Sequence, residues 1–351
     1  EDEVWCIVRR TKGDGTVIRC IEYMKPRDWG DDQKDCFFVD SGLTFDGGDP
    51  VNVTAISKAD PCVVTAANTF SDGDQVKFYN VLGMSEVRNK VFTVSNPTTT
   101  NFELRDKLDT VDIDSTAFTT FITSITGDTT YKGELITNLT TAEIALLDVG
   151  MSITGTGIPS GTVITELYDT SFKMSNEATV NGTAVVITIQ GTVAQVDNAF
   201  SGLDHLEGKM VSVLGDGTVH DDVVVSSGAV ALTDYFNKAH IGLPYTSKLM
   251  PMKLEAQTQS GTARAKIKRI HSIIFSFYKS LGCTFGTDKG TEIIPFRKTT
   301  DTMGEAVPLF TGEKKQDDFP GGYELSGDIY VEQKQPLPLT VRSITPRLQL
   351  Y

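Results

Sequence analysis

The sequence predicts an all-β fold built from several domains, and three observations support this. β-branched and aromatic residues alternate with polar ones over short runs, as in strands with one buried face. Pairs of Gly, Asp and Asn residues that favour tight turns separate the runs. The runs recur roughly every 8–12 residues, a spacing typical of sandwiches and barrels. The 351 residues are enough for about two to four domains of ordinary size.

Individual strands and turns follow from the same pattern. We expect strands at residues 75–79, 90–94, 162–165 and 183–189. We expect hairpin turns at three dipeptides whose residues tolerate positive φ angles, namely Asp72-Gly73, Asn181-Gly182 and Asp216-Gly217. These elements alone already favour a chain of short antiparallel strands.

Only short helices are expected. Thr140 and Glu143 have the spacing of a capping box, and good helix formers follow, so residues 140–147 predict a short helix. Residues 257–269 also favour a brief helix. We interpret residues 270–278 as a strand because they are aromatic and β-branched. A helix continuing to Leu281 is the alternative, because five apolar residues keep near-helical spacing: Ile267, Ile270, Ile274, Phe277 and Leu281.

Charge and cysteine content narrow the function classes. The net charge is −14, from 46 acidic and 32 basic residues, which argues against general nucleic-acid binding through a basic surface. Residues 41–191 hold 18 acidic and 8 basic residues and so contribute −10. The five cysteines are irregularly spaced without a CxxC motif, and the four histidines are scattered. We therefore expect neither a disulfide framework nor a zinc site. We expect the protein to reside in a reducing compartment.

The start of the chain and its hydropathy lead to two further expectations. No signal peptide opens the sequence, and no apolar run approaches the ~18 residues of a membrane helix, so we expect no stable membrane association. The chain begins at Glu1 instead of Met, which indicates a segment of a longer polypeptide.

Most candidate chemistry has a simpler structural interpretation. The Gly-rich segment 155–161 lacks a following Lys-Ser/Thr and precedes a strand, so we expect a turn and no phosphate site. Asp204, His205 and Glu207 could form an acid/base cluster or hold a metal, but a turn before the next strand is favoured. The acidic groups at Asp31, Asp32 and Asp35, and at Asp317 and Asp318, lack calcium-loop spacing. We predict no catalytic residue, cofactor or metal.

One basic cluster interrupts the acidic chain, at Arg264, Lys266, Lys268 and Arg269. Repeated around a ring, it could line a DNA channel and contact phosphates. The same residues could equally pair with acidic neighbours at a subunit interface. Replacing all four with Gln is expected to spare folding.

The most distinctive segment covers residues 200–213 and continues at 216–219. It resembles the "GLDHLEGKTVSVLADGxV" signature of the tail nozzle proteins (tail tubular protein B family) of short-tailed phages. Further segments are similar to family landmarks and keep their order: residues 4–10, 21–23, 40–44, 240–245, 268–271, 280–282 and 335–341. Family members are considerably longer, so the resemblance implies that this is their C-terminal part.

The resemblance also implies a split core. In simpler relatives the segments corresponding to 40–44 and 202–208 lie close together, whereas two modules separate them here. We predict a barrel- or propeller-like nozzle core at 1–50 and 192–351. The insertion at 51–121 resembles a small phage β-domain that is likened to part of the ubiquitin-activating enzyme. The insertion at 122–191 resembles a β-module common in phage structural proteins.

The function that the resemblance implies is structural. A homohexameric ring at the distal tip of the virion tail would dock on the tail adaptor ring and form a conduit and gate for DNA ejection. It would assemble in the host cytoplasm and touch phage DNA transiently in its lumen, with tail fibres or spikes as further partners. The alternative is a tail attachment protein whose modules bind a host receptor or glycan. A third class, a tail-associated depolymerase, lacks any assignable carboxylate pair.

Overall fold

The computed structural model describes residues 3–350 except 27, 31, 256, 259–260, 263–265, 300 and 302–305. The fold is nearly all β, with 48% strand and 3% helix, which confirms the predicted fold class. The chain divides into two compact units. Unit 1 comprises Glu1–Phe45, Ala199–Leu232 and Lys238–Tyr351, and unit 2 comprises Asp46–Asn198 and Thr233–Asn237.

A closed six-strand barrel forms the first part of unit 2. Its strands, in spatial order, are β15 (Thr192–Gln195), β4 (Val51–Ile56), β5 (Val63–Ala66), β8 (Asn101–Arg105), β7 (Val91–Ser95) and β6 (Gln75–Tyr79). β15 pairs with β4 on one side and with β6 on the other, so Val193 lies opposite both Val51 and Phe78. The barrel at 51–121 is therefore closed by a strand that follows the second module in the sequence, and the predicted four-domain division stays a prediction.

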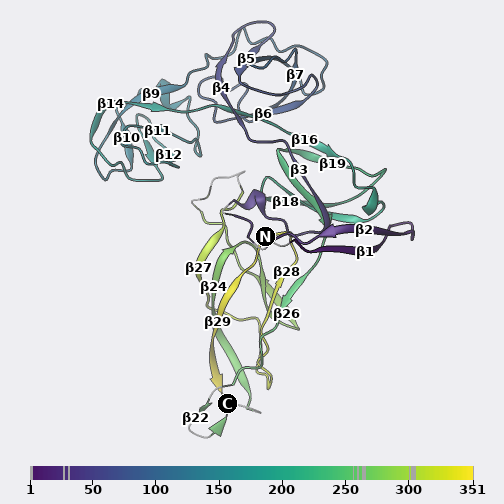
Figure 1. Cartoon of the computed structure of the whole chain (residues 1–351). Coiled ribbons are helices and arrows are strands. Elements are labelled where there is room, and N and C mark those ends of the chain that lie inside the picture. The colour runs from purple at the N-terminus through teal and green to yellow at the C-terminus, as the bar shows by residue number, and fades with distance from the viewer. Residues whose placement is uncertain are drawn as a thin grey trace. The chain divides into compact units, whose positions relative to one another are not determined.

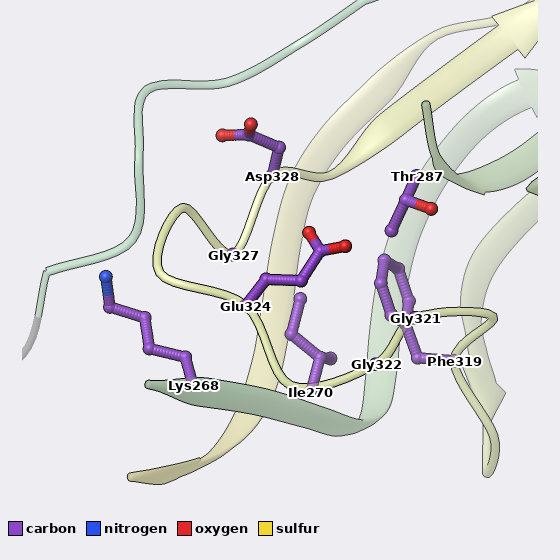
Figure 2. Close-up of a pocket in the computed structure, with 9 residues that line it drawn as sticks. All are labelled: Lys268, Ile270, Thr287, Phe319, Gly321, Gly322, Glu324, Gly327 and Asp328. Carbon is purple, nitrogen blue, oxygen red and sulfur yellow. The ribbon is translucent and has the colours of Figure 1, made fainter. Parts of the chain in front are cut away.

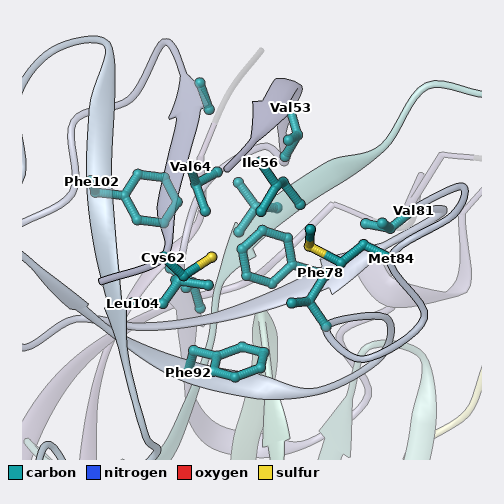
Figure 3. Packing of buried hydrophobic residues seen from close by; sticks show 14 of the residues in the cluster. Val53, Ile56, Cys62, Val64, Phe78, Val81, Met84, Phe92, Phe102 and Leu104 are labelled. Carbon is teal, nitrogen blue, oxygen red and sulfur yellow. The ribbon is translucent and has the colours of Figure 1, made fainter. Parts of the chain in front are cut away.

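The barrel interior explains why these runs form strands. On β6 and β8, residues with buried side chains alternate with more exposed ones, as a pleated strand requires. The fully buried rings of Phe78 and Phe102 fill the interior (Figure 3). Each packs edge-to-face against another ring, with centroids 5.9 Å apart for Phe78 and Phe92 and 5.5 Å apart for Phe102 and Phe70.

The second part of unit 2 is a six-stranded sheet. Its order is β11 (Thr154–Gly155), β14 (Gly182–Thr188), β9 (Ser124–Thr129), β10 (Leu135–Thr137), β13 (Phe172–Met174) and β12 (Ile164–Leu167). The predicted short helix is present as α1 (Thr141–Ile144), and both hydrogen bonds of the Thr140–Glu143 capping box form.

The hairpin predicted at Asn181-Gly182 is wrong. Neither residue has a positive φ, and β14, which begins at Gly182, pairs with β9 instead of the preceding β13. The Asn181 side chain accepts a hydrogen bond from the Tyr131 backbone N–H at 2.8 Å, so it fixes a loop and does not form a tight turn. The turns at Gly73 and at Asp216 and Gly217 have the expected positive φ angles.

Two polar side chains join the barrel to the second module. The Arg88 guanidinium donates to the carbonyl oxygens of Val81 at 2.8 Å and Leu146 at 2.6 Å, and it pairs with Asp148. The Asn80 amide donates to Gln190 O at 2.9 Å. The Arg88 side chain is only 7% exposed, so water competes little for these hydrogen bonds. They therefore stabilise the connection between the two parts of unit 2.

Unit 1 begins with a hairpin and a four-stranded sheet. The hairpin strands are β1 (Trp5–Thr11) and β2 (Val17–Tyr23). The sheet has the order β18 (Thr218–Val224), β17 (Met210–Gly215), β20 (Lys238–Leu243) and β3 (Asp40–Asp46). Two single turns of 3₁₀ helix accompany it, η1 (Gln33–Asp35) and η2 (Asp204–Leu206). The strands β16 (Asp197–Phe200) and β19 (Val230–Phe236) cross the boundary between the units.

The C-terminal part of unit 1 contains two further sheets around an aromatic core. One has the order β27 (Phe310–Gln316), β24 (Lys268–Ser280) and β29 (Val341–Leu350), and β24 and β29 are the long strands seen in Figure 1. The other has the order β21 (Ser247–Leu249), β28 (Tyr330–Gln333), β25 (Thr284–Thr287) and β26 (Gly290–Ile293). Phe275, Phe277 and Phe285 are fully buried between them.

The strand interpretation of residues 270–278 is confirmed, because they lie within β24. The brief helix expected at 257–269 is wrong for the described residues of that segment. They include β22 (Gln257–Thr258) paired with β23 (Gly261–Thr262), and the start of β24. The tertiary environment overrides helix propensity here, since β24 buries Ile273, Phe275 and Phe277 at a period of two.

We predict that Phe102→Ala lowers the unfolding free energy of unit 2 by about 3–5 kcal/mol, because it leaves a cavity in a closed barrel. Chemical denaturation followed by circular dichroism measures this. Leu108→Ala is the control, since Leu108 is 72% exposed, and its effect should stay below about 0.5 kcal/mol. Equal effects of the two substitutions would contradict the observed packing.

Candidate functional site

The segments that carry the sequence resemblance meet in unit 1. β3 contains residues 40–44 and lies next to β20, which contains most of residues 240–245. Their backbones approach so closely at two glycines that a side chain would not fit. A Cβ atom at Gly242 would lie 2.6 Å from the Gly42 Cα, and one at Gly42 would lie 2.8 Å from Ile241 O. Glycine is therefore required on both strands.

The third segment, residues 202–208, is attached to the first by a histidine. His205 Nε2–H donates to Ser41 O at 2.8 Å. Glu207 accepts hydrogen bonds from the backbone N–H groups of Ser227 and Gly228, at 3.1 and 2.7 Å. Through these contacts His205 and Glu207 hold turns together.

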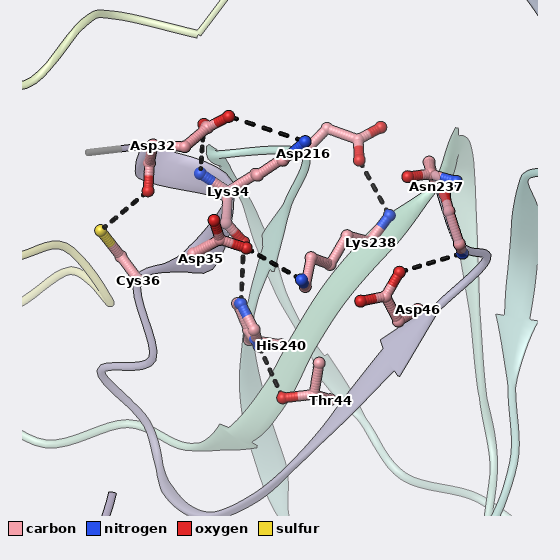
Figure 4. A network of polar contacts seen from close by, with 11 residues as sticks. Asp32, Lys34, Asp35, Cys36, Thr44, Asp46, Asp216, Asn237, Lys238 and His240 are labelled. Carbon is pink, nitrogen blue, oxygen red and sulfur yellow. Dashed lines mark hydrogen bonds and ion pairs between the residues drawn. The ribbon is translucent and has the colours of Figure 1, made fainter. Parts of the chain in front are cut away.

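His240 is the most buried titratable group among these segments, at 3% exposure. Figure 4 shows its imidazole between η1 and β3. One ring nitrogen, Nε2, lies 2.9 Å from Lys34 O, and the other, Nδ1, lies 2.9 Å from Thr44 Oγ1. A carbonyl can only accept, so Nε2 carries the proton and Nδ1 accepts from the threonine hydroxyl. The neutral imidazole therefore satisfies both partners.

The surroundings of His240 oppose its protonation. Burial lowers its pKa below the ordinary value of 6.5, and the cations of Lys238 and Lys25 lower it further, although the hydrogen bond to the Lys34 carbonyl acts in the opposite direction. Lys238 Nζ pairs with Asp35 at 2.8 Å, and its backbone N–H donates to Asp216 at 2.8 Å. Polar bonds thus link η1, β20 and the β17–β18 turn.

Cys36 lies at the end of this network of polar bonds. Burial, together with the nearby carboxylates of Asp35 and Asp32, raises the pKa of its thiol to about 12. Such a thiol is protonated at neutral pH and is a poor nucleophile. All five cysteines are free thiols, and those of Cys62 and Cys283 are also buried.

The basic cluster of the sequence does not form a continuous charged surface in the described residues. Arg264 lies outside the described residues, and Lys266 is half-buried. Lys268 is 4% exposed, and its ammonium donates to Leu325 O at 2.9 Å. The Arg269 guanidinium lies 5.3 Å from the centre of the Tyr323 ring. Successive residues on a strand point to opposite faces, which separates Lys268 from Arg269.

A small pocket lies where β24 begins, lined by Lys268, Ile270, Thr287, Phe319, Gly321, Gly322, Glu324, Gly327 and Asp328 (Figure 2). Its volume is about 10 Å³, enough for about one water molecule. Glu324 forms an ion pair with Lys289. Asp328 Oδ1 is buried without a hydrogen-bond partner among the described residues. The sequence does not single out residues 321–328, because their glycines and acidic residues are spaced as in an ordinary loop.

The described residues contain no group of three or more His, Cys, Asp or Glu side chains placed to hold a metal ion. Within the described part of the chain, no helix is long and apolar enough to cross a membrane. The Gly-rich segment 155–161 is a turn with positive φ at Gly157 and Gly161, and β12 follows it. Asp32 accepts from the Lys34 backbone N–H at 3.1 Å and caps η1.

Comparison of the chain with protein-family models and with curated proteins finds no match. In the geometry above, polar side chains join segments that are distant in the sequence.

We predict that His240→Gln reduces the acid sensitivity of unit 1. The folded protein resists protonating His240, whereas the unfolded chain binds a proton near pH 6.5, so wild-type stability falls as the pH drops from 7.5 to 5.5. The slope from this residue approaches at most about 1.4 kcal/mol per pH unit. Denaturation of both proteins across this range measures the difference. Parallel stability curves would contradict the assignment.

We also predict that Lys268→Gln lowers the unfolding free energy by about 1–3 kcal/mol, because it removes a buried donor to Leu325 O. Because Lys268 is buried, we no longer expect that all four residues of the basic cluster can be replaced with Gln without a loss of stability. Lys334→Gln is the control, since that side chain is 62% exposed and forms only a surface ion pair. Equal stability of both variants in urea titrations would argue against the buried position of Lys268.

Proposed function

We propose that this chain is a structural protein of the distal tail nozzle of a short-tailed phage, and not an enzyme. One observation carries the proposal. The segments resembling that family at 40–44, 202–208 and 240–245 lie far apart in the sequence and pack together in unit 1 through Gly42, Gly242 and His205. Most of the chain between the first two belongs to unit 2. A core interrupted by an insertion accounts for this arrangement.

Insertion at a turn costs a fold little free energy. Asp46 and Asn198 are the first and last residues of the main part of unit 2, and the chain enters and leaves it between elements of unit 1. An insertion whose ends lie close together adds little loop-closure entropy and leaves the parent core intact. In the proposed nozzle, the inserted modules project outward and contact tail fibres or spikes.

The charge supports a conduit over a DNA-binding protein. A net charge of −14 gives a surface that repels the phosphate backbone, which allows DNA to pass without being held. In the proposed nozzle, six copies form the ring, the ring docks on the tail adaptor, and DNA touches the lumen only during ejection. Lys268 is engaged with Leu325 O, so this residue is not a proposed phosphate contact.

A host-attachment function is the second candidate, favoured by two exposed rings in unit 2. Tyr131 is 56% exposed with Lys132 Nζ 5.5 Å from its ring centre, and Tyr168 is 43% exposed. Exposed aromatic rings of this kind suit sugar stacking. Binding of the intact chain to host cells, compared with Tyr131→Ala and Tyr168→Ala, tests this. Loss of cell binding in these variants favours attachment as the function.

Electron microscopy of the virion tests the nozzle proposal. We expect both units in a ring of six on the tail axis at the tip, below the adaptor. Density for the chain away from that axis would refute the proposal. Incubation of the protein with host polysaccharide or peptidoglycan should release no reducing ends, and release of such ends would favour a depolymerase.

A further inference from the structure

The hairpin β1–β2 presents an apolar face to solvent. Cross-strand partners on this face are Trp5 with Tyr23 and Ile7 with Ile21. Ile7 and Ile21 are 76% and 74% exposed, and Trp5 is 60% exposed. The Trp5 and Tyr23 ring centroids lie 5.3 Å apart. Four large apolar side chains so arranged form a contiguous exposed patch, which marks interaction surfaces in soluble proteins.

The opposite face of the hairpin is fixed to the rest of unit 1. Arg10 forms hydrogen-bonded ion pairs with Glu22 at 2.7 Å and with Asp40 of β3 at 2.6 Å. Glu22 also accepts from the Ser41 hydroxyl. At the turn, the Gly13 backbone N–H donates to Glu207 O at 2.7 Å. The hairpin is therefore held from both its side and its turn, and its apolar face is preorganised for binding.

Two arginines give this face its charge. Arg9 and Arg19 lie directly opposite each other, both are exposed, and neither has an ion-pair or hydrogen-bond partner among the described residues. Like charges directly across a strand pair destabilise it. Carboxylates from another surface would remove this repulsion. Trp, Tyr and Arg are also the residues that contribute most to binding at protein interfaces.

We propose that this face, defined by Trp5, Ile7, Arg9, Arg19, Ile21 and Tyr23, binds an acidic surface on a second copy of this chain. The chain carries a net charge of −14, so a neighbouring copy supplies the opposite charge. Two such faces do not pair with each other, because that would bring four arginines together. The contact is consequently head-to-tail, and repeated head-to-tail contacts generate rings or filaments.

The receiving surface is on β17–β18 of the neighbouring copy. Met210 and Val224 are cross-strand partners, and each is 56% exposed. Asp221 and Asp222 are exposed on the edge strand β18, where a register shift leaves both of them opposite Ser212. Asp222 accepts a hydrogen bond of 2.6 Å from the Ser212 hydroxyl. This surface thus offers apolar side chains to Ile7 and Ile21 and carboxylates to the two arginines. The inference deepens the proposed function and depends on it only for closure into a six-membered ring.

Sedimentation and native mass spectrometry of the full chain test the contact. We expect the wild-type protein to associate, more weakly at high salt because the contact is partly electrostatic. Arg9→Glu with Arg19→Glu, and separately Ile7→Ser with Ile21→Ser, should weaken association about tenfold or more. Lys58→Glu with Lys107→Glu is the matched charge control at exposed sites of unit 2 and should leave association unchanged. Circular dichroism checks that each variant is folded.

A charge exchange sharpens the test. Chains with Arg9→Glu and Arg19→Glu, and chains with Asp221→Arg and Asp222→Arg, should each fail to associate alone. Mixed together, they should associate again, because every contact then joins opposite charges. A monomeric wild type, association unaffected by the hairpin variants, or a mixture that stays monomeric would overturn the proposal. So would binding of a monomeric wild type to anionic lipid vesicles through the same residues.

The two proposals fail separately. If virions lack this chain at the tail tip while the charge exchange restores association, the nozzle function is wrong and the contact stands. If the chain is found in the nozzle but its association ignores the hairpin variants, the contact is wrong and the function stands.

Discussion

The close approach of β3 and β20 is the constraint on which unit 1 depends. Gly42 and Gly242 leave no room for side chains between the two strands, so the backbones themselves form the contact. Around it, Ser41 O accepts from His205, and Thr44 donates to His240. His240 in turn donates to Lys34 O and so positions η1. A chain that leaves unit 1 after Phe45 and returns at Ala199 is rejoined by this set of contacts.

The polar groups in this region hold segments of unit 1 together. A buried neutral imidazole, a carboxylate that accepts two backbone N–H groups, and an ion pair between Lys238 and Asp35 each satisfy a neighbour. Groups with satisfied hydrogen bonds in a packed sheet are held rigidly. The hairpin β1–β2 is tied to the same region, since the Gly13 backbone N–H donates to Glu207 O.

Local sequence patterns predict the features that depend on near neighbours. Alternation at period two predicts β6 and β7, and the Thr140–Glu143 spacing predicts α1, because both patterns depend on residues close in the sequence. Asn181-Gly182 misleads, since the Asn181 side chain is recruited by Tyr131 from a distant segment. Burial of Lys268 cannot be predicted from the sequence either, because its partner Leu325 lies in a loop without a motif. Alternation in β1 and β2 cannot distinguish a face turned toward a core from one turned toward solvent.

The closing strand of the barrel also sets an order of events during synthesis. β4 to β8 emerge from the ribosome first, but β15 follows only after the whole second module. Until then, the edges of β4 and β6 lack their partner, and an unpaired strand edge is a template for wrong pairing. In the folded chain, hydrogen bonds from Arg88 and Asn80 join the barrel to the second module. Closure of the barrel therefore waits until the whole second module has been synthesised.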